Sequence, residues 1–370
     1  MHTDTAIVIG GGQSGLGAAY ALRNQGFAPI VLEAGEEPVG SWPHYYDSLT
    51  AFTPLRIFSL PGMPFPGDPG HFPARDEVVA YLRRYASRLD CDIRTGQRVV
   101  SVVADRRGYV AETADGSRFH GTVAVAATGN FQNPHRPELP GLADFTGRVI
   151  HSSEYRAPGP FAGQRVVVVG SGTSAVQIAY ELSGHAHSSI ASRRPLNFST
   201  WKLGPTREPV WKMVDAVCRL PIAPLLPPLS KYNHIPDFDG VYRTAFDRGR
   251  PERREMFTGA EGGELLWADG TRERVDTIVL GTGYRPALEY LRPLGALRPD
   301  GTPRQRHGLS TSHPGLAYLG IEGQHTLFSN ALYGVGTDAA HIARSLRRRV
   351  AGSRPALLPR PRTAREAARV

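Results

Sequence analysis

The sequence contains few cysteines and no long apolar stretch, and each absence excludes a class of protein. Its 370 residues include two cysteines, Cys91 and Cys218, which lie far apart in the chain. This excludes a disulfide framework, a CxxC redox pair and a cysteine-based zinc site, and it favours a cytoplasmic protein. Four prolines interrupt the most apolar segment, residues 217–229, so we predict no membrane span. The N-terminus lacks the basic head and apolar core of a signal peptide.

The sequence also lacks an even spread of positive charge. The net charge is +9, but residues 341–370 contain nine arginines and one acid, so the remaining body is nearly neutral. A neutral body argues against nucleic acid as a partner. We interpret residues 349–370 as a solvated, disordered tail rich in proline and arginine. An anion- or partner-binding arm is the alternative interpretation.

Residues 5–33 have the pattern of a strand, a glycine-rich turn, a helix and a second strand, which is a βαβ unit. Gly10 permits the tight turn, Gly12 lets backbone N–H groups approach a pyrophosphate, and Gly15 lets the helix pack on the strand. Glu33 follows Gly10 by 23 residues, where a carboxylate accepts hydrogen bonds from adenosine ribose hydroxyl groups. The complete pattern predicts a site for a dinucleotide without a 2′-phosphate, with FAD as the expected ligand.

The same pattern returns over residues 165–192, with Gly170 and Gly172 in the turn. The residue 23 positions after the first glycine is now Arg193, and Arg194 follows it. A guanidinium group binds a ribose 2′-phosphate, which a carboxylate repels, so we predict that this unit binds NADPH. A solvated arginine pair at a strand end is the alternative. The residues assigned to the NADPH site in this unit are Gly170, Gly172, Thr173, Ser174, Ser192, Arg193 and Arg194.

Apolar periodicity predicts further elements between and after the two units. Helices are expected over 76–89 and 337–348, and strands over 98–103, 109–113, 121–127, 265–267 and 275–280. Two of these strands lead into Thr-Gly, which lets backbone come close to a ligand at the carboxyl end of a strand. We assign Thr128 and Gly129 to the FAD site, and Thr282, Gly283 and Tyr284 to the NADPH site. Simple strand-to-loop turns are the alternative.

Between the two units lies the pattern FxGxxxHxxxY, formed by Phe145, Gly147, His151 and Tyr155. With the glycine motifs on either side, it resembles the signature of the flavin-containing monooxygenases, and residues 46–66 resemble the shorter bacterial and YUCCA-like members. Related Baeyer–Villiger enzymes have tryptophan at the last position of the signature. His151 either adjusts the position of a cofactor or domain, or is a hydrogen-bonded spacer in a linker.

The resemblance implies an α/β fold with two dinucleotide-binding, Rossmann-like domains, the NADPH domain being inserted into the FAD domain. We expect the FAD domain to consist of residues 1–155 and 280–348. The NADPH domain is expected over residues 156–279, and its weakly periodic segment 204–254 is expected to form an irregular cap. A homodimer is a candidate assembly.

The resemblance also implies a function. It predicts a FAD-dependent monooxygenase that uses NADPH and O2, acts through a C4a-(hydro)peroxyflavin and oxygenates a soft nitrogen or sulfur of a small molecule. The first alternative is Baeyer–Villiger oxygenation or oxidative decarboxylation of a carbonyl substrate. The second is an NADPH-sensing flavoprotein without turnover. Because the cofactor carries this chemistry, no catalytic side chain and no metal are required.

Further site residues follow from the resemblance. The FAD site is assigned Gly10, Gly12, Gly15, Glu33, Trp42, Val99, Thr128, Gly129 and Asp338. Trp42 either stacks near the flavin or packs as an ordinary aromatic residue. Asp338 lies just before or at the start of the last expected helix, whose N-terminus would face the flavin pyrimidine ring. Phe52 and Asp47 are candidate pocket residues; Phe52 stands where animal members have asparagine, and Asp47 is alternatively a turn residue.

Overall fold

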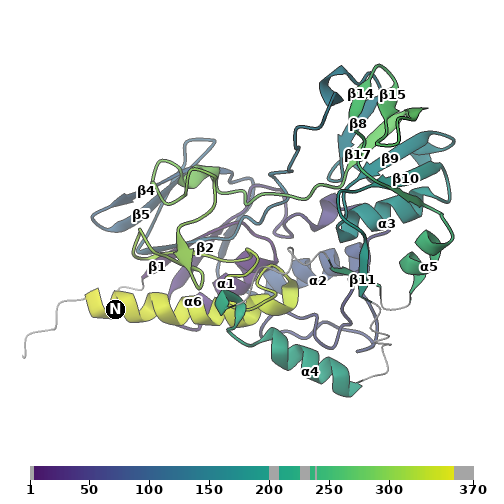
Figure 1. Cartoon of the computed structure of the whole chain (residues 1–370). Helices are drawn as coiled ribbons and strands as arrows, with labels where there is room; N and C mark the ends of the chain where they lie inside the picture. The colour runs from purple at the N-terminus through teal and green to yellow at the C-terminus, as the bar shows by residue number, and fades with distance from the viewer. Residues whose placement is uncertain (1–3, 200–207, 226–233, 238–239, 354–370) are drawn as a thin grey trace, which may run out of the picture.

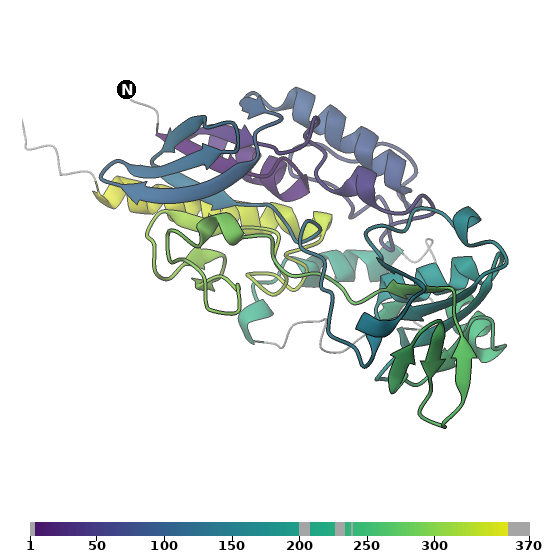
Figure 2. The ribbon, with the colours of Figure 1, turned by 90° about the horizontal axis from the view of Figure 1, so that it is seen from above.

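A computed structural model describes residues 4–199, 208–225, 234–237 and 240–353 (Figure 1). Two α/β units lie side by side and are joined by extended segments, as Figures 1 and 2 show. The second unit lies within the sequence of the first, because the chain returns to the sheet of the first unit after completing that of the second. This confirms the predicted α/β class and the inserted arrangement.

The first unit is built on a seven-stranded sheet with the order β18-β19-β20-β7-β1-β2-β3. The strands from β20 to β3 are parallel, and β18 and β19 are antiparallel additions at one edge. Their bounds are β1 Thr5–Ile9, β2 Ala28–Leu32, β3 Asp92–Arg94, β7 Val123–Ala126, β18 Gln305–Arg306, β19 Leu309–Ser310 and β20 Leu316–Tyr318. The alternation of side chains along β1 divides its two faces between different layers.

Helices cover one face of this sheet. They are α1 Gln13–Arg23, α2 Arg75–Arg88 and α6 Leu332–Ser353, and α6 runs along α1 in both views. Ala6 and Val8 of β1 pack into this helical layer. A small antiparallel sheet covers the other face, where Ile7 and Ile9 pack. Its strands are β4 Val99–Asp105, β5 Gly108–Thr113 and β6 Arg118–Gly121.

The second unit repeats the same three layers around a parallel sheet with the order β13-β10-β9-β17-β8. The strands are β8 Arg148–His151, β9 Arg165–Val169, β10 His187–Ala191, β13 Glu252–Arg254 and β17 Thr277–Leu280. Val166 and Val168 of β9 face the helical layer, and Val167 and Val169 face a second small antiparallel sheet. The helices are α3 Thr173–Leu182 and α5 Val241–Asp247, and the small sheet consists of β14 Gly259–Glu261, β15 Glu264–Leu266 and β16 Arg272–Arg274.

Further elements lie in the connections. They are η1 Trp42–His44, η2 Leu142–Asp144, η3 Gly159–Phe161, η4 Ala223–Leu225, η6 Glu289–Leu291, β11 Asn197–Ser199, β12 His234–Pro236 and α4 Glu208–Cys218. Although α4 lies within the sequence of the second unit, between β10 and β13, it packs on the first. Its Trp211 is buried against Ile57 and Phe72.

Four sequence predictions differ from the structure. The boundary at residue 155 is too late, because β8 already pairs with β17 of the second unit. Segment 204–254 is more regular than expected of an irregular cap, because its described parts include α4, α5 and the sheet strand β13. The last helix begins at Leu332 rather than at residue 337. It also extends to Ser353, so residues 349–353 are helical, and the rest of the expected tail lies outside the described residues.

Candidate functional site

The first candidate site is the glycine turn between β1 and α1. Gly10 has a φ of 102°, and a Cβ at this position would lie 2.6 Å from the Ala127 carbonyl oxygen. A Cβ on Gly15 would lie 1.7 Å from the Gly10 carbonyl oxygen, so only glycine allows the helix to approach the turn so closely. The helix begins after Gly12, and no side chain caps this end. Its first N–H groups therefore fit the pyrophosphate of a dinucleotide.

Glu33 lies at the carboxyl end of β2, beside this turn. Its carboxylate is largely buried, with 9% of the residue exposed. One oxygen accepts a hydrogen bond from the Gly11 N–H at 2.5 Å, and the other accepts one from the Gly35 N–H at 2.7 Å. The structure therefore places Glu33 next to the glycine turn, as the 23-residue spacing predicts, and adds that it holds the turn in place.

The glycine turn, the N-terminus of α1 and Glu33 together form what we call the first cradle. Several residues that the sequence did not single out complete it. The Gln13 side chain accepts a hydrogen bond from the Trp42 indole N–H at 3.1 Å and donates one to the Asn330 carbonyl oxygen at 3.0 Å. It thereby ties the turn to η1 and to the approach of α6. Two further glycines lie against the turn, since a Cβ on Gly40 would lie 2.7 Å from Gly12 and one on Gly320 would lie 2.3 Å from the Ser14 hydroxyl. Their positive φ angles of 60° and 91° are not visible as a sequence motif.

The other residues assigned to FAD or to the pocket have more varied positions. Val99 is the first residue of β4 and packs at the edge of the small sheet. Phe52 is 43% exposed, like several other large apolar side chains of this protein. Asp47 is exposed, accepts a hydrogen bond from Arg75 at 2.5 Å and lies in the turn that the Leu49 N–H closes on the Tyr46 carbonyl oxygen at 3.1 Å, as the turn interpretation expects.

The position of Asp338 differs from the prediction. Because α6 begins at Leu332, this residue lies inside the helix and not at its N-terminus. The carboxyl group is buried and accepts a hydrogen bond from the Thr326 N–H at 3.2 Å. Burial raises its pKa to about 6. Asp338 therefore fastens the loop before α6 to the helix.

The second candidate site repeats the first. Gly170 has a φ of 145°, and a Cβ there would lie 2.3 Å from the Gly281 carbonyl oxygen, as Gly10 lies against Ala127. The helix α3 begins after Gly172 and has no side-chain cap. A Cβ on Gly172 would meet no described atom within 4 Å, so the space in front of Thr173 and Ser174 is open. This end of α3 also fits a pyrophosphate.

Arginines gather at the carboxyl end of β10, beside the second site. Arg193 and Arg194 are exposed and follow Ser192, which is buried. The Ser192 hydroxyl donates a hydrogen bond to the Arg194 carbonyl oxygen at 2.8 Å. Arg253, which the sequence did not identify, reaches Ser192 from the neighbouring strand β13. Arg193 and Arg194 therefore follow the strand end that corresponds to Glu33 in the first unit, and the Arg253 guanidinium group lies beside it.

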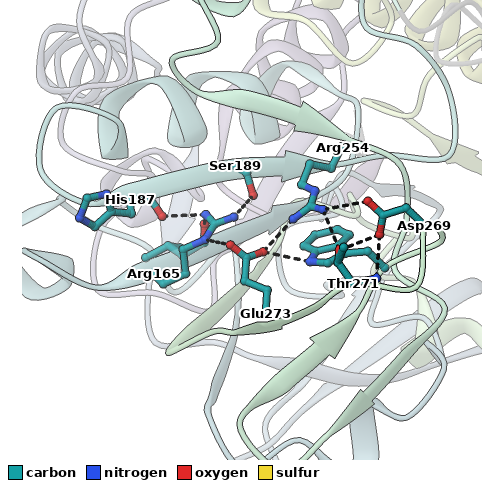
Figure 3. Close-up of polar contacts among 9 residues, drawn as sticks. Arg165, His187, Ser189, Arg254, Asp269, Thr271 and Glu273 are labelled. Carbon is teal, nitrogen blue, oxygen red and sulfur yellow. Dashed lines mark hydrogen bonds and ion pairs between the residues drawn. The ribbon is translucent and has the colours of Figure 1, made fainter.

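A polar network under the sheet holds β13 in place (Figure 3). Glu273 of β16 binds Arg165 of β9 at 2.6 Å and Arg254 of β13 at 3.0 Å, and it accepts a hydrogen bond from the Trp267 indole at 2.9 Å. The Arg254 guanidinium group lies 4.0 Å from the centroid of the Trp267 ring. Although burial opposes it, the two arginines lower the pKa of Glu273. Successive side chains of a strand point to opposite faces of the sheet. Because Arg254 is anchored on one face, Arg253 points to the opposite face.

The two Thr-Gly motifs lie in the segments that join the units. Thr128 donates a hydrogen bond to the Ala287 carbonyl oxygen at 2.6 Å, and Thr282 donates one to the His135 carbonyl oxygen at 2.5 Å. The His135 N–H in turn donates to the Gly283 carbonyl oxygen at 2.9 Å. The two linkers, residues 128–135 and 282–287, are thus bonded to each other along their length. The two threonine hydroxyl groups hold the linkers together.

His151 lies at the end of β8, fully buried against the second linker. Its Nε2 lies 3.0 Å from the Gly283 carbonyl oxygen, and its Nδ1 lies 3.1 Å from the Ser153 N–H. A neutral ring with the proton on Nε2 satisfies both contacts, and burial lowers the pKa of this histidine. The Tyr284 ring packs edge-on against it at 5.0 Å. These contacts fix the ring between the end of β8 and the second linker.

The remaining signature residues are buried in the second unit, where the chain enters it from the first. Phe145 is buried in the core shared with the small sheet, and a Cβ on Gly147 would lie 2.5 Å from the Phe145 ring. Tyr155 is fully buried and donates a hydrogen bond to Glu181 of α3 at 2.8 Å. The signature therefore shapes the junction between the two units.

The described residues contain neither a membrane-spanning helix nor a clustered metal-binding set. In those parts of the chain, no helix combines the length and apolar character needed to cross a bilayer. Within the same residues, no group of three or more histidine, cysteine or acidic side chains is placed to bind a metal ion.

Comparisons with known proteins agree with this geometry. The family described as pyridine nucleotide-disulphide oxidoreductase matches residues 7–201. The chain is 30% identical over 342 residues to a Bacillus velezensis protein named uncharacterized oxidoreductase CzcO, covering 92% of this chain and 98% of that protein. It is 27% identical to indole-3-pyruvate monooxygenase YUCCA1 of Oryza sativa subsp. japonica, covering 92% and 91% of the two chains.

A solved structure shares the whole architecture. The flavin-containing monooxygenase from Stenotrophomonas maltophilia superimposes with a TM-score of 0.81 at 30% sequence identity. The similarity covers 94% of this chain and 98% of that one. Both units and the insertion of one into the other are therefore shared.

Proposed function

The chain belongs to the flavin-containing monooxygenase family and is a flavin-dependent oxidoreductase, and from this premise we propose that it uses FAD, NADPH and O2 to oxygenate a soft nitrogen or sulfur atom of a small molecule. One observation carries the proposal: two dinucleotide cradles of the same geometry carry opposite charges at the same position. Glu33 lies beside the first, and three arginines lie beside the second.

The charges support a different dinucleotide for each cradle. A carboxylate accepts hydrogen bonds from ribose hydroxyl groups but repels a 2′-phosphate, so Glu33 fits FAD. Arg193, Arg194 and Arg253 fit the 2′-phosphate of NADPH, since guanidinium groups bind phosphate through paired hydrogen bonds. When bound, FAD supplies the hydride acceptor and the reaction with O2.

The protein's own residues bind the two dinucleotides and orient them relative to each other. The uncapped ends of α1 and α3 receive the two pyrophosphates, and the bonded linkers set the distance between the cradles. Hydride transfer requires the reacting atoms to lie about 3–3.5 Å apart. Fixing this geometry is the catalytic contribution that the chain itself makes.

A carbonyl substrate is the second candidate. The relative from rice is named as a monooxygenase of indole-3-pyruvate, a keto acid, and it matches 92% of this chain. Phe52 also stands where animal members have an asparagine, so their substrates are no guide to the substrate of this protein. Oxygenation or oxidative decarboxylation of a carbonyl compound therefore stands as the alternative.

The test is a substrate screen with the purified flavoprotein. NADPH oxidation and O2 uptake are followed with amines, thioethers, ketones and keto acids, and products are identified by mass spectrometry. The proposal expects substrate-dependent NADPH oxidation coupled to an N-oxide or sulfoxide. Coupling to an ester or a decarboxylated acid would select the second candidate. Flavin reduction by NADPH without coupling to any of these classes would favour a sensor without turnover.

A further inference from the structure

A short segment of the first unit connects the two cradles directly. This bridging segment, residues 42–47, begins at Trp42, whose indole donates a hydrogen bond to Gln13 in the first glycine turn. It reaches the second cradle at Tyr46. The Tyr46 hydroxyl donates a hydrogen bond to the Gln177 side chain of α3. The first turn of this helix, which contains Ser174, lies next to the predicted pyrophosphate site.

Both units hold the bridging segment rigidly. From the first unit, Arg75 of α2 donates a hydrogen bond to the Tyr45 carbonyl oxygen at 2.9 Å. From the second, Arg156 donates to the carbonyl oxygens of Pro43 at 3.0 Å and Tyr45 at 2.9 Å. Tyr46 itself is buried, and its ring lies 6.2 Å from that of Tyr155. The segment that carries Tyr46 is therefore bonded to both units.

The linkers are one of the connections between the two units. They are bonded to each other through Thr282, His135 and Gly283. Tyr46 contacts α3, which is not part of either linker, and so joins the two units at a second place. The contact acts on the helix that carries the predicted NADPH pyrophosphate site.

We propose that Tyr46 is a positioning residue that sets the second cradle relative to the first, so that hydride passes from the nicotinamide of NADPH to the flavin. In this step NADPH becomes NADP⁺, and the flavin gains the hydride. The inference rests on the proposed function. Binding of NADPH depends mainly on the second unit, whereas hydride transfer depends on how the two units are placed. Loss of the contact should therefore affect the rate of reduction and leave affinity unchanged.

The test is anaerobic rapid mixing of the flavoprotein with NADPH, which separates the limiting rate of flavin reduction from the NADPH Kd. Tyr46→Phe keeps the ring and removes the hydroxyl, and we expect the limiting rate to fall about tenfold while the Kd changes less than about twofold. Gln177→Ala should have the same effect. The double variant should be no slower than either single variant, because both changes remove one contact.

The matched control is Tyr109→Phe, which removes a buried hydroxyl bonded at 2.8 Å to the Pro314 carbonyl oxygen within the first unit. It should leave both constants unchanged. The inference is overturned if Tyr46→Phe and Gln177→Ala both reduce flavin at the wild-type rate. It is also overturned if they raise the Kd for NADPH without slowing reduction, or if Tyr109→Phe slows reduction equally. Gln177→Ala decides the matter if Tyr46→Phe loses flavin. A wild-type protein without FAD, or with flavin that NADPH does not reduce, would instead contradict the proposed function.

Discussion

The Arg253 guanidinium group donates hydrogen bonds to the hydroxyl and the carbonyl oxygen of Ser192, each at 3.3 Å. Ser192 precedes the arginine pair at the end of β10, so Arg253 brings a third positive charge to this corner from a strand more than fifty residues later. A cluster of this charge suits a phosphate group better than it suits a neutral ribose.

Removing the arginine pair should weaken NADPH binding selectively. A charge-assisted guanidinium–phosphate contact contributes on the order of 1.5–3 kcal/mol, which is roughly 10- to 100-fold in affinity. The double variant Arg193→Ala, Arg194→Ala should raise the KM for NADPH by about that factor and change the KM for NADH far less. Steady-state kinetics with both nicotinamides measure this. Equal losses for both would mean that the arginines stabilise the unit and do not read the phosphate.

Arg253→Ala should have the same selectivity with a smaller effect, about tenfold in the KM for NADPH. The matched control is Arg272→Ala, whose guanidinium group is exposed on the small sheet and paired with Glu261. The control should leave both KM values unchanged. If Arg253→Ala behaves like the control, the guanidinium group only supports Ser192.

Gly12→Asp should abolish FAD binding. The carboxylate would meet the negative pyrophosphate at the end of α1, and its Cβ would lie only 3.2 Å from Gly40. The flavin content of the purified variant, read from its absorbance, checks this. Gly172→Asp at the matching position of α3 is the control: it should retain flavin and lose reduction by NADPH. A yellow Gly12→Asp protein would show that the first turn does not hold the cofactor.

Oxygen reactivity should depend on the second cradle. When reduced protein with bound NADP⁺ meets O2, the family resemblance predicts a transient absorbance that lies between those of the oxidised and reduced cofactor. Rapid-mixing spectroscopy measures its lifetime, with and without NADP⁺. Immediate reoxidation with stoichiometric H2O2 under both conditions would indicate an oxidase or a sensor.

The stability of the first unit should depend on pH through His325. Burial, together with His341, His307 and Arg344, lowers its pKa from the usual 6.5 to about 4. Between these values the unfolded chain binds more protons than the folded one, so the contribution of His325 to stability is lost as pH falls from 6.5 towards 4. Urea unfolding at about pH 7 and about pH 5 should show a smaller loss for His325→Gln than for the wild type.

The contribution of Asp338 to stability changes with pH in the opposite direction to that of His325. Comparing the wild type with His325→Gln separates the two contributions. Burial raises the pKa of this carboxyl group from 3.8 to about 6, so its contribution to stability is present below 3.8 and lost as pH rises through 6. Asp338 is present in both proteins, and its effect cancels in their difference. The same pH dependence in wild type and His325→Gln would contradict the assignment to His325.

The sequence by itself determined both cradles. Each is a local pattern in which glycines stand where a side chain would collide with backbone, as Gly15 does with Gly10, and the discriminating charge lies a fixed distance along the same βαβ unit. The sequence also predicted helix α2 and most of the strands, because the apolar periodicity of each lies within one short segment.

The tertiary structure decided what depends on distant parts of the chain. Strand β8 has four residues, and only its pairing with β17 shows to which unit it belongs. Arg253 reaches Ser192 because β13 pairs with β10 and Arg254 is anchored beneath the sheet. Tyr46 meets Gln177 across the boundary between the units. No local periodicity encodes such contacts, since they arise from packing between segments that the sequence keeps far apart.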